Sequence, residues 1–293
     1  MKRIIGLFSI GLVFLTSGCF KKDDLEDITI YTSVYPIEYI VDTLYGKNSN
    51  VKSIYPDGVD VSKYSLTDKQ IKDYSKGNMF IFNGLSDEKD YVTSMFNYNK
   101  DLMIIDTTAT MEYNNHVEEL WLDPSNFLMM SLNVKNGLLE YITNQYLKTE
   151  IDNNYSKLKL EISNIDAKIK LMNENSSKKT IVVDNSSFKF LEKYGFEVIS
   201  LEDNEELTDK TISDVIRMVR KKQITYIFST DANNLNKNVQ KIVKKTGVEI
   251  LELNDLSNLT ENQRNSKEDY ISLLNENIDL LKKELYSWKR YFN

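Results

Sequence analysis

The feature that most constrains the fold is a repeated alternation of short apolar runs with longer amphipathic stretches. The runs are rich in β-branched and aromatic residues, and the stretches between them carry apolar residues at helical spacing. This alternation is typical of βαβ units, so we predict an α/β protein of two lobes, each with a four-stranded, mainly parallel sheet flanked by helices. The two sets of runs are residues 28–34, 51–56, 79–84 and 102–106, and residues 180–184, 197–201, 225–230 and 248–253.

A single long helix is expected between the two sets of runs. Residues 149–175 contain no proline or glycine, and about 25 helical residues span roughly 37 Å at 1.5 Å per residue. We therefore predict a rigid rod joining an N-terminal lobe (28–148) to a C-terminal lobe (176–293). A further helix is expected at 269–288, packed against the second lobe. The apolar face of the rod consists of Tyr155, Leu158, Ile162, Ile165, Ile169 and Met172.

The N-terminal residues indicate export and lipid anchoring. Two basic residues precede an apolar run at 4–15, which is shorter than the roughly 20 residues needed to cross a bilayer. Small residues then precede Cys19, the single cysteine of the chain, as in a bacterial lipoprotein cleavage site. We predict that residues 1–18 are a signal peptide, that Cys19 is lipidated and that residues 19–27 form a tether. The protein would then be anchored at the extracytoplasmic face of the bacterial cell membrane, since two acyl chains suffice for stable anchoring.

Charge and motif content exclude two broad classes of function. The net charge is −7, which disfavours nucleic-acid binding and suits a cationic ligand better. The sequence contains no G-x-S-x-G motif, no glycine-rich phosphate loop and no H-E-x-x-H motif. We therefore expect neither an enzyme nor a nucleic-acid partner.

Several segments, in order along the chain, carry a family resemblance. They include "SVYPIEYIVDTLYGKNSNVKSIYPDGVD" (33–60), "WLDP" (121–124) and "IVVDNSSFKFLEKYG" (181–195). From about residue 28 to its end, the chain resembles the metal-binding solute receptors of ABC transporters, the zinc and manganese receptor family. The resemblance implies a monomeric receptor that captures a solute between its lobes and delivers it to a permease and its ATPase.

The resemblance also implies which positions face the cleft. The family binds its metal with three histidines and one or two carboxylates at the ends of strands, where open α/β sheets bind ligands. His116, the only histidine, lies three residues upstream of the matched position, and we expect it to be a bystander. The histidine positions match Ser62, Glu119 and Asp184, and the acid positions match Thr230 and Asn254, with Asp255 beside it.

The substituted residues leave three functions open. Without imidazoles a tight zinc site is disfavoured, whereas a set of oxygen ligands suits Ca²⁺, Mg²⁺ or Mn²⁺. If Glu119 and Asp184 face each other, they need a cation between them, a protonated carboxyl or a polar ligand that bonds both. The chain is thus a receptor for one divalent metal ion (Mn, Zn or Ca/Mg), a receptor for a non-metal solute, or a surface-anchored binding or adhesion lipoprotein that has lost metal binding. The rigid rod predicts only a small closure of the cleft.

Overall fold

A computed structural model describes residues 25–111, 119–204 and 207–286. The predicted signal peptide, Cys19 and His116 lie outside the described residues. Within these three ranges, no helix is both long enough and apolar enough to cross a membrane.

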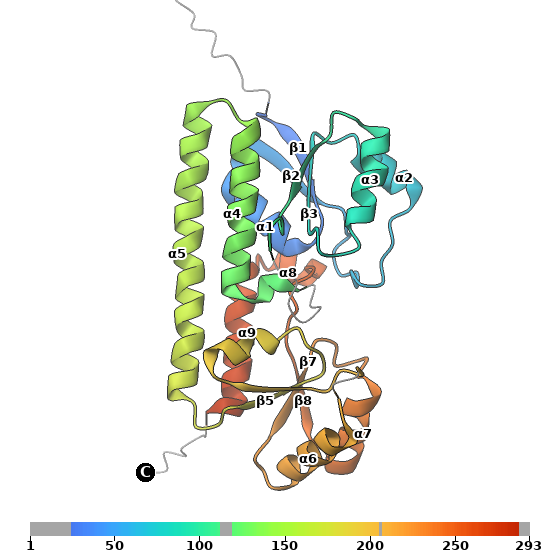
Figure 1. The fold of residues 1–293 in the computed structure, drawn as a ribbon, viewed down its shortest axis with the longest axis vertical. Coiled ribbons are helices and arrows are strands. Elements are labelled where there is room, and N and C mark those ends of the chain that lie inside the picture. The colour runs from blue at the N-terminus through green and yellow to red at the C-terminus, as the bar shows by residue number, and fades with distance from the viewer. Residues whose placement is uncertain (1–24, 112–118, 205–206, 287–293) are drawn as a thin grey trace, which may run out of the picture.

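The first lobe is built on a parallel sheet of four strands in the order β2-β1-β3-β4 (Figure 1). Apolar side chains fill both faces of β3, all of whose residues are buried, as expected for a central parallel strand. The strands are β1 (Ile28–Thr32), β2 (Ser49–Ser53), β3 (Met79–Phe82) and β4 (Met103–Asp106), and the connecting helices are α1 (Tyr35–Tyr45), the short η1 (Gly46–Asn48), α2 (Asp68–Tyr74) and α3 (Lys89–Tyr98).

The second lobe repeats this plan with a parallel sheet in the order β6-β5-β7-β8. The prediction of two four-stranded parallel sheets flanked by helices is thereby confirmed. The strands are β5 (Thr180–Val183), β6 (Glu197–Ser200), β7 (Tyr226–Ser229) and β8 (Glu249–Glu252), and the helices are η3 (Lys189–Tyr194), α6 (Asp209–Arg220) and α7 (Lys237–Thr246).

A helical hairpin runs along one side of the first lobe, and its longer helix continues beside the second lobe (Figure 1). It consists of η2 (Leu120–Leu122), α4 (Pro124–Tyr141) and α5 (Gln145–Asn175). The predicted rod is α5, which begins four residues earlier than expected; its 31 residues span about 46 Å. Its buried face includes Leu158, Ile162 and Ile165, as the spacing predicts.

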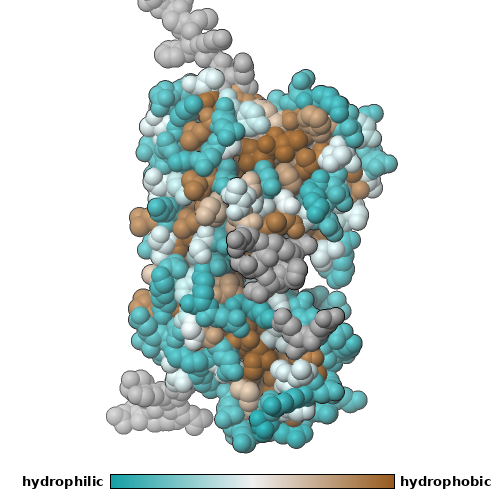
Figure 2. All heavy atoms as spheres, in the orientation of Figure 1, coloured by the Kyte–Doolittle hydropathy of each residue, from teal (hydrophilic) through white to brown (hydrophobic). Residues whose placement is uncertain are grey.

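The C-terminal helix α9 (Tyr270–Leu285) connects the two lobes. Its last residue accepts backbone hydrogen bonds from Ser177 and Lys178 beside β5, in agreement with the predicted packing on the second lobe. Its first residue lies farther up, where the Tyr270 ring stacks on Phe127 of α4. One hydrophobic cluster therefore runs through both lobes, and a smaller one lies under α6 and α7. The outline of the molecule is mostly hydrophilic, with hydrophobic atoms visible over the middle of each lobe (Figure 2).

Candidate functional site

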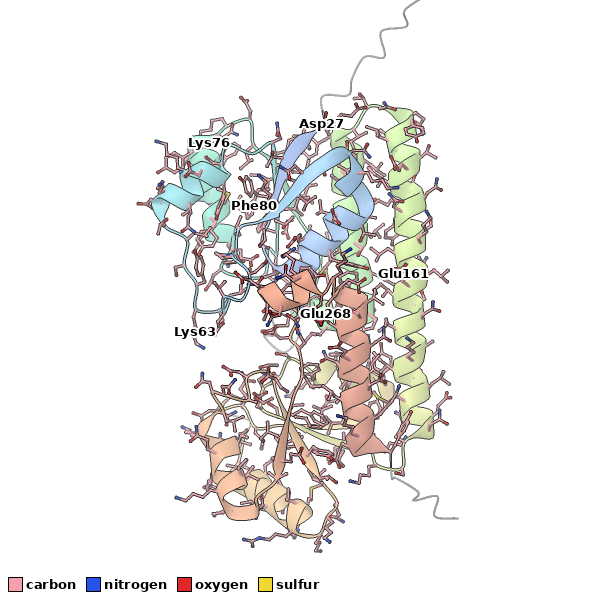
Figure 3. The ribbon with its side chains drawn as sticks, turned by 180° about the vertical axis from the view of Figure 1, so that it is seen from behind. Asp27, Lys63, Lys76, Phe80, Glu161 and Glu268 are labelled. Carbon is pink, nitrogen blue, oxygen red and sulfur yellow. The ribbon has the colours of Figure 1, made fainter. Side chains whose placement is uncertain are left out.

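A cavity of about 910 Å³ lies between the two lobes. Loops at the carboxyl ends of the strands line it from both sides, which is the usual ligand position in open α/β sheets. Lys63 stands at the edge of the first lobe and points toward the second (Figure 3). All six sequence-predicted positions lie on the cavity wall: Ser62, Glu119, Asp184, Thr230, Asn254 and Asp255.

These six positions do not form a preformed cluster of acidic metal ligands. Among the described residues, no group of three His, Cys, Asp or Glu side chains is placed so that it could hold a metal ion. Glu119 is partly buried immediately before η2, and its backbone carbonyl accepts a hydrogen bond from Leu122. The role of the six residues as ligands therefore remains a prediction.

Asp184 follows β5 directly, so the end of that strand positions its carboxylate at the cavity. The carboxylate accepts hydrogen bonds from the Ser229 hydroxyl and, at 3.2 Å, from the backbone N–H of Thr230. Burial nevertheless raises the pKa of Asp184, because desolvation outweighs these hydrogen bonds. A cation in the cavity would stabilise the ionised form of this carboxyl.

Two asparagines fix the wall around Asp184. The side-chain amide of Asn185 donates to Thr230 Oγ1 at 2.8 Å, and that of Asn236 donates to the backbone carbonyl of Asp184 at 2.8 Å. Asn236 also caps α7 through its side-chain oxygen. The polar groups of the second-lobe wall are therefore held in place by hydrogen bonds between loops that follow different strands.

Asn254 and Asp255 follow β8, and their hydrogen bonds distinguish them. The side-chain oxygen of Asn254 accepts from the backbone N–H of Leu256 at 2.7 Å, so it is used to form a turn. Asp255 accepts from Ser257 N and Oγ, both at 2.9 Å and both through Oδ1. Burial raises the pKa of Asp255, and the nearby charge of Asp60 raises it further. Asp255 is therefore the better candidate ligand of the two.

The wall of the first lobe contains two charged residues that the sequence analysis did not single out. Asp60 Oδ1 accepts from Ser62 N at 3.1 Å and Ser62 Oγ at 2.6 Å, and Asp60 Oδ2 accepts from Lys63 Nζ at 2.5 Å. Lys63 and Ser62 lower the pKa of Asp60, so it stays ionised. The hydrogen bond to Asp60 and the charge of Asp60 raise the pKa of Lys63, and the charge of Asp231 on the opposite lobe adds a smaller contribution. The spacing of an aspartate two residues before a serine in a loop indicates such a local turn, and could have drawn attention to Asp60.

The cavity is strongly acidic overall. Ten of the residues that line it are aspartate or glutamate, and Lys63 is the one basic residue among the described residues on its wall. Both lobes supply the acids, since Asp60 comes from the first and Asp184 from the second. Such a lining attracts cations and repels anions.

Comparison with known proteins places these features in context. Residues 30–284 match the model of the family described as zinc-uptake complex component A periplasmic. The zinc-binding lipoprotein AdcA of Streptococcus pneumoniae is 22% identical over 96% of this chain, and the match spans 61% of AdcA, so the chain corresponds to about three fifths of that relative. A metal ABC transporter substrate-binding lipoprotein of Lactococcus lactis is 22% identical over 96% of this chain and 97% of its own length.

Solved structures show the same architecture. The Zn(II)-bound ZnuA-like domain of Streptococcus pneumoniae AdcA superposes with a TM-score of 0.74 at 19% identity, over 89% of this chain and 100% of that domain. The laminin-binding protein Lbp of Streptococcus pyogenes gives a TM-score of 0.73 at 17% identity, over 89% of this chain and 99% of Lbp. At these identities the structural likeness shows the fold alone.

Proposed function

Since the chain belongs to the family of zinc-uptake complex component A periplasmic proteins, we propose that it is the solute-binding lipoprotein of an ABC importer. In this proposal Cys19 carries the lipid anchor, the lobes face outward from the cytoplasmic membrane, and a permease with its ATPase receives the solute. The receptor acts as a monomer and has no enzymatic activity. The name of the Lactococcus lactis relative, a substrate-binding lipoprotein of a metal ABC transporter, supports this role.

The proposed solute is a divalent cation held through oxygen atoms. The observation that carries this proposal is the acidic lining of the cavity, to which both lobes contribute. Asp184 and Asp255 supply carboxylates, and Ser62 and Thr230 supply hydroxyls. Calcium, magnesium and manganese ions accept such donors and retain water molecules where protein ligands are lacking.

A tight zinc site is not expected in this cavity. Protein zinc sites depend on nitrogen and sulfur ligands, and the three positions that match histidines hold Ser62, Glu119 and Asp184. We therefore propose Mn²⁺ or Ca²⁺ as the metal ions that suit this set of oxygen ligands.

A larger organic cation is the second candidate. The cavity volume of about 910 Å³ falls within the roughly 300–1,000 Å³ typical of small-molecule pockets and far exceeds that of a bare ion. The same acids that attract a metal ion would pair with the ammonium groups of a polyamine. This candidate keeps the receptor role and changes only the class of solute.

Calorimetric titration of the metal-stripped protein tests the proposal. Mn²⁺, Ca²⁺, Zn²⁺ and spermidine are titrated separately, and we expect at least one of them to saturate with a Kd below about 10 μM. The affinity should fall as salt is added, because the partly exposed acids of the cavity are then screened. No heat of binding from any of the four cations would contradict a cation receptor and would favour an anchored surface protein that has lost solute binding.

A further inference from the structure

One segment of the second-lobe chain crosses to the first lobe and docks there. Residues 253–268, which we call the strap, connect β8 to α9 and contain the short helix α8 (Glu261–Asn265). Leu253, Leu256 and Leu259 of the strap are fully buried within the hydrophobic cluster that runs through both lobes. In Figure 1, α8 lies at the level of the first lobe, above β7 and β8.

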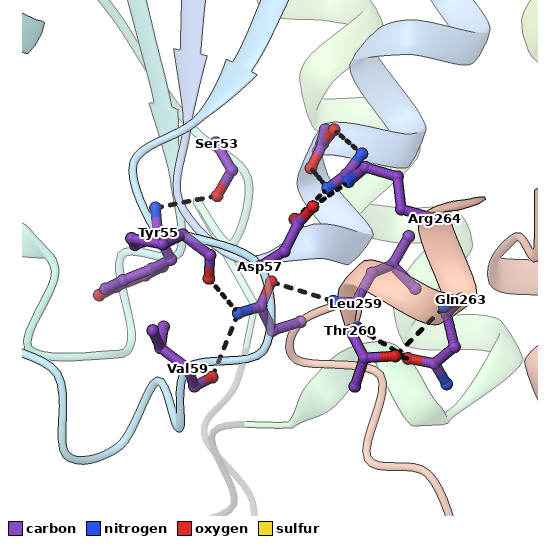
Figure 4. Close-up of polar contacts among 11 residues, drawn as sticks. Ser53, Tyr55, Asp57, Val59, Leu259, Thr260, Gln263 and Arg264 are labelled. Atoms are coloured by element: carbon purple, nitrogen blue, oxygen red, sulfur yellow. Dashed lines mark hydrogen bonds and ion pairs between the residues drawn. The ribbon is translucent and has the colours of Figure 1, made fainter.

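The strap is bonded to the loop that carries Ser62. This loop, residues 56–65, is called the Ser62 loop. Gly58 N donates to the backbone carbonyl of Leu259 at 2.7 Å, and Gly58 has a φ of 77°, which glycine adopts readily. The side-chain amide of Asn258 donates to the carbonyls of Pro56 and Val59 at 2.7 and 3.1 Å (Figure 4).

Arg264 adds an ionic clamp at the same place (Figure 4). Its Nε and Nη2 donate to the two carboxylate oxygens of Asp57 at 2.7 and 2.8 Å. Its Nη1 and Nη2 donate to the carboxylate of Glu38 on α1 at 2.9 and 3.2 Å. Two-pronged contacts of this kind fix the orientation of both partners, which a lysine in the same place could not do.

The strap and the Ser62 loop form adjacent parts of the cavity wall. Asp255 belongs to the strap, and Asp60 and Ser62 belong to the loop; all three line the cavity, whereas Arg264 does not. A wall that is held before the ligand arrives avoids the entropic cost of ordering it on binding. The clamp therefore lies outside the cavity and joins two segments that line it.

We propose that Arg264 is a positioning residue of the receptor: through Asp57 and Glu38 it holds the Ser62 loop against the strap and so presets the solute cavity. Its effect on solute affinity rests on the proposed function, but its effect on the loop does not. Because the chain of the second lobe is bonded to the wall of the first, strap and loop move as one unit.

Hydrogen–deuterium exchange on the full chain tests the positioning role without any ligand. In Arg264→Met the Gly58 amide should exchange roughly tenfold faster, because the clamp no longer opposes local opening of the loop. Amides of β5 to β8 should exchange as in the wild type. Asp57→Asn removes the charge of the partner on the loop and should accelerate Gly58 exchange in the same direction. The double variant should be no faster than Arg264→Met, because both changes act on the same contact between loop and strap.

Arg217→Met is the matched control, since Arg217 forms an exposed ion pair with Asp214 on α6, away from the loop. It should leave Gly58 exchange unchanged. If the amides of the whole first lobe exchanged equally faster in Arg264→Met, the clamp would contribute only to global stability and the positioning role would be wrong. Unchanged exchange at Gly58 would also overturn the proposal. If Arg264→Met does not fold, Asp57→Asn decides the same question.

A titration with Mn²⁺ separates this inference from the proposed function. If the wild type binds Mn²⁺, Arg264→Met should bind it roughly tenfold more weakly, and Arg217→Met should bind it unchanged. Equal affinity of Arg264→Met and the wild type would contradict the preset cavity. If the wild type binds no Mn²⁺, the metal proposal fails, while the exchange experiment still decides whether Arg264 positions the loop.

Discussion

The double substitution Asp184→Asn and Asp255→Asn is expected to weaken Mn²⁺ binding at least about 100-fold, a loss of about 2.7 kcal/mol. Each change removes a carboxylate charge from the cavity wall and keeps a side-chain oxygen for the local donors, Ser229 and Ser257 respectively. The fold should therefore survive, and the loss of affinity should reflect charge. Calorimetric titration of the double variant beside the wild type measures it.

The pH dependence of this affinity provides a second readout. Burial raises the pKa of both Asp184 and Asp255. Protons therefore compete with the cation at a higher pH than for exposed carboxyls: affinity is full above the raised pKa values and falls as the pH drops through them. The double variant should lack this part of the pH dependence.

Asp279→Asn is the matched control for the charge effect. Asp279 is exposed on α9, where it pairs with Lys282. This substitution removes one carboxylate charge from the chain, as each half of the double variant does, without changing the cavity wall, and Mn²⁺ affinity should stay within about twofold of the wild type. An equal loss in Asp279→Asn and the double variant would mean that net charge, and not the cavity, governs binding.

Tyr270→Ala is expected to lower the free energy of unfolding by about 3 to 5 kcal/mol. The Tyr270 side chain is fully buried at the start of α9, where its ring stacks on Phe127 at a centroid distance of 4.0 Å and on Tyr39 at 5.5 Å. Its hydroxyl donates to the backbone carbonyl of Trp121. Alanine would leave a cavity at the point where α9 meets the first lobe and would leave that carbonyl without this donor. Urea denaturation measures the change.

Two further variants identify the source of the loss. Tyr270→Phe keeps the ring and removes the hydroxyl, so it should cost only about 1 kcal/mol. Tyr146→Ala removes a tyrosine that is 75% exposed and should change stability by less than about 0.5 kcal/mol. If Tyr270→Ala lowered the free energy of unfolding by less than about 1 kcal/mol, α9 would not be held to the first lobe by this side chain.

The contact between α9 and the first lobe is also connected to the cavity wall through hydrogen bonds. Trp121, which accepts the Tyr270 hydrogen bond, donates through Nε1 to the backbone carbonyl of Asp255 at 2.7 Å. The "WLDP" segment that carried much of the family resemblance thus connects α9 to the strap. Its tryptophan acts here in positioning the wall and does not itself contribute a charged ligand.

The secondary structure was predictable because burial leaves a local periodic signal in the sequence. The central strand β3 is apolar at every position, and the face of α5 repeats at steps of three and four. Strand β2 was placed two residues too late, because it lies at the edge of the sheet and begins with the polar residues Ser49 and Asn50, which do not look like a strand.

The candidate site was predictable in position but not in chemistry. The match to the family's motifs identified all six wall positions, whereas the use of each oxygen depends on hydrogen bonds that no periodicity reveals. Asn254 illustrates this limit, because its side-chain oxygen is bonded to the backbone of Leu256. The strap is a larger example: Arg264 and Glu38 are 226 residues apart in the chain, so their contact could not be inferred from local sequence.

The most direct test of the account is to locate the bound cation. A crystal structure of the metal-stripped protein soaked with Mn²⁺, with data collected near the manganese absorption edge, gives an anomalous difference map. We predict one principal peak inside the cavity, within coordination distance of an oxygen of Asp184 or Asp255. A peak only at surface carboxylates outside the cavity, or none at a Mn²⁺ concentration that saturates the calorimetric signal, would contradict the account.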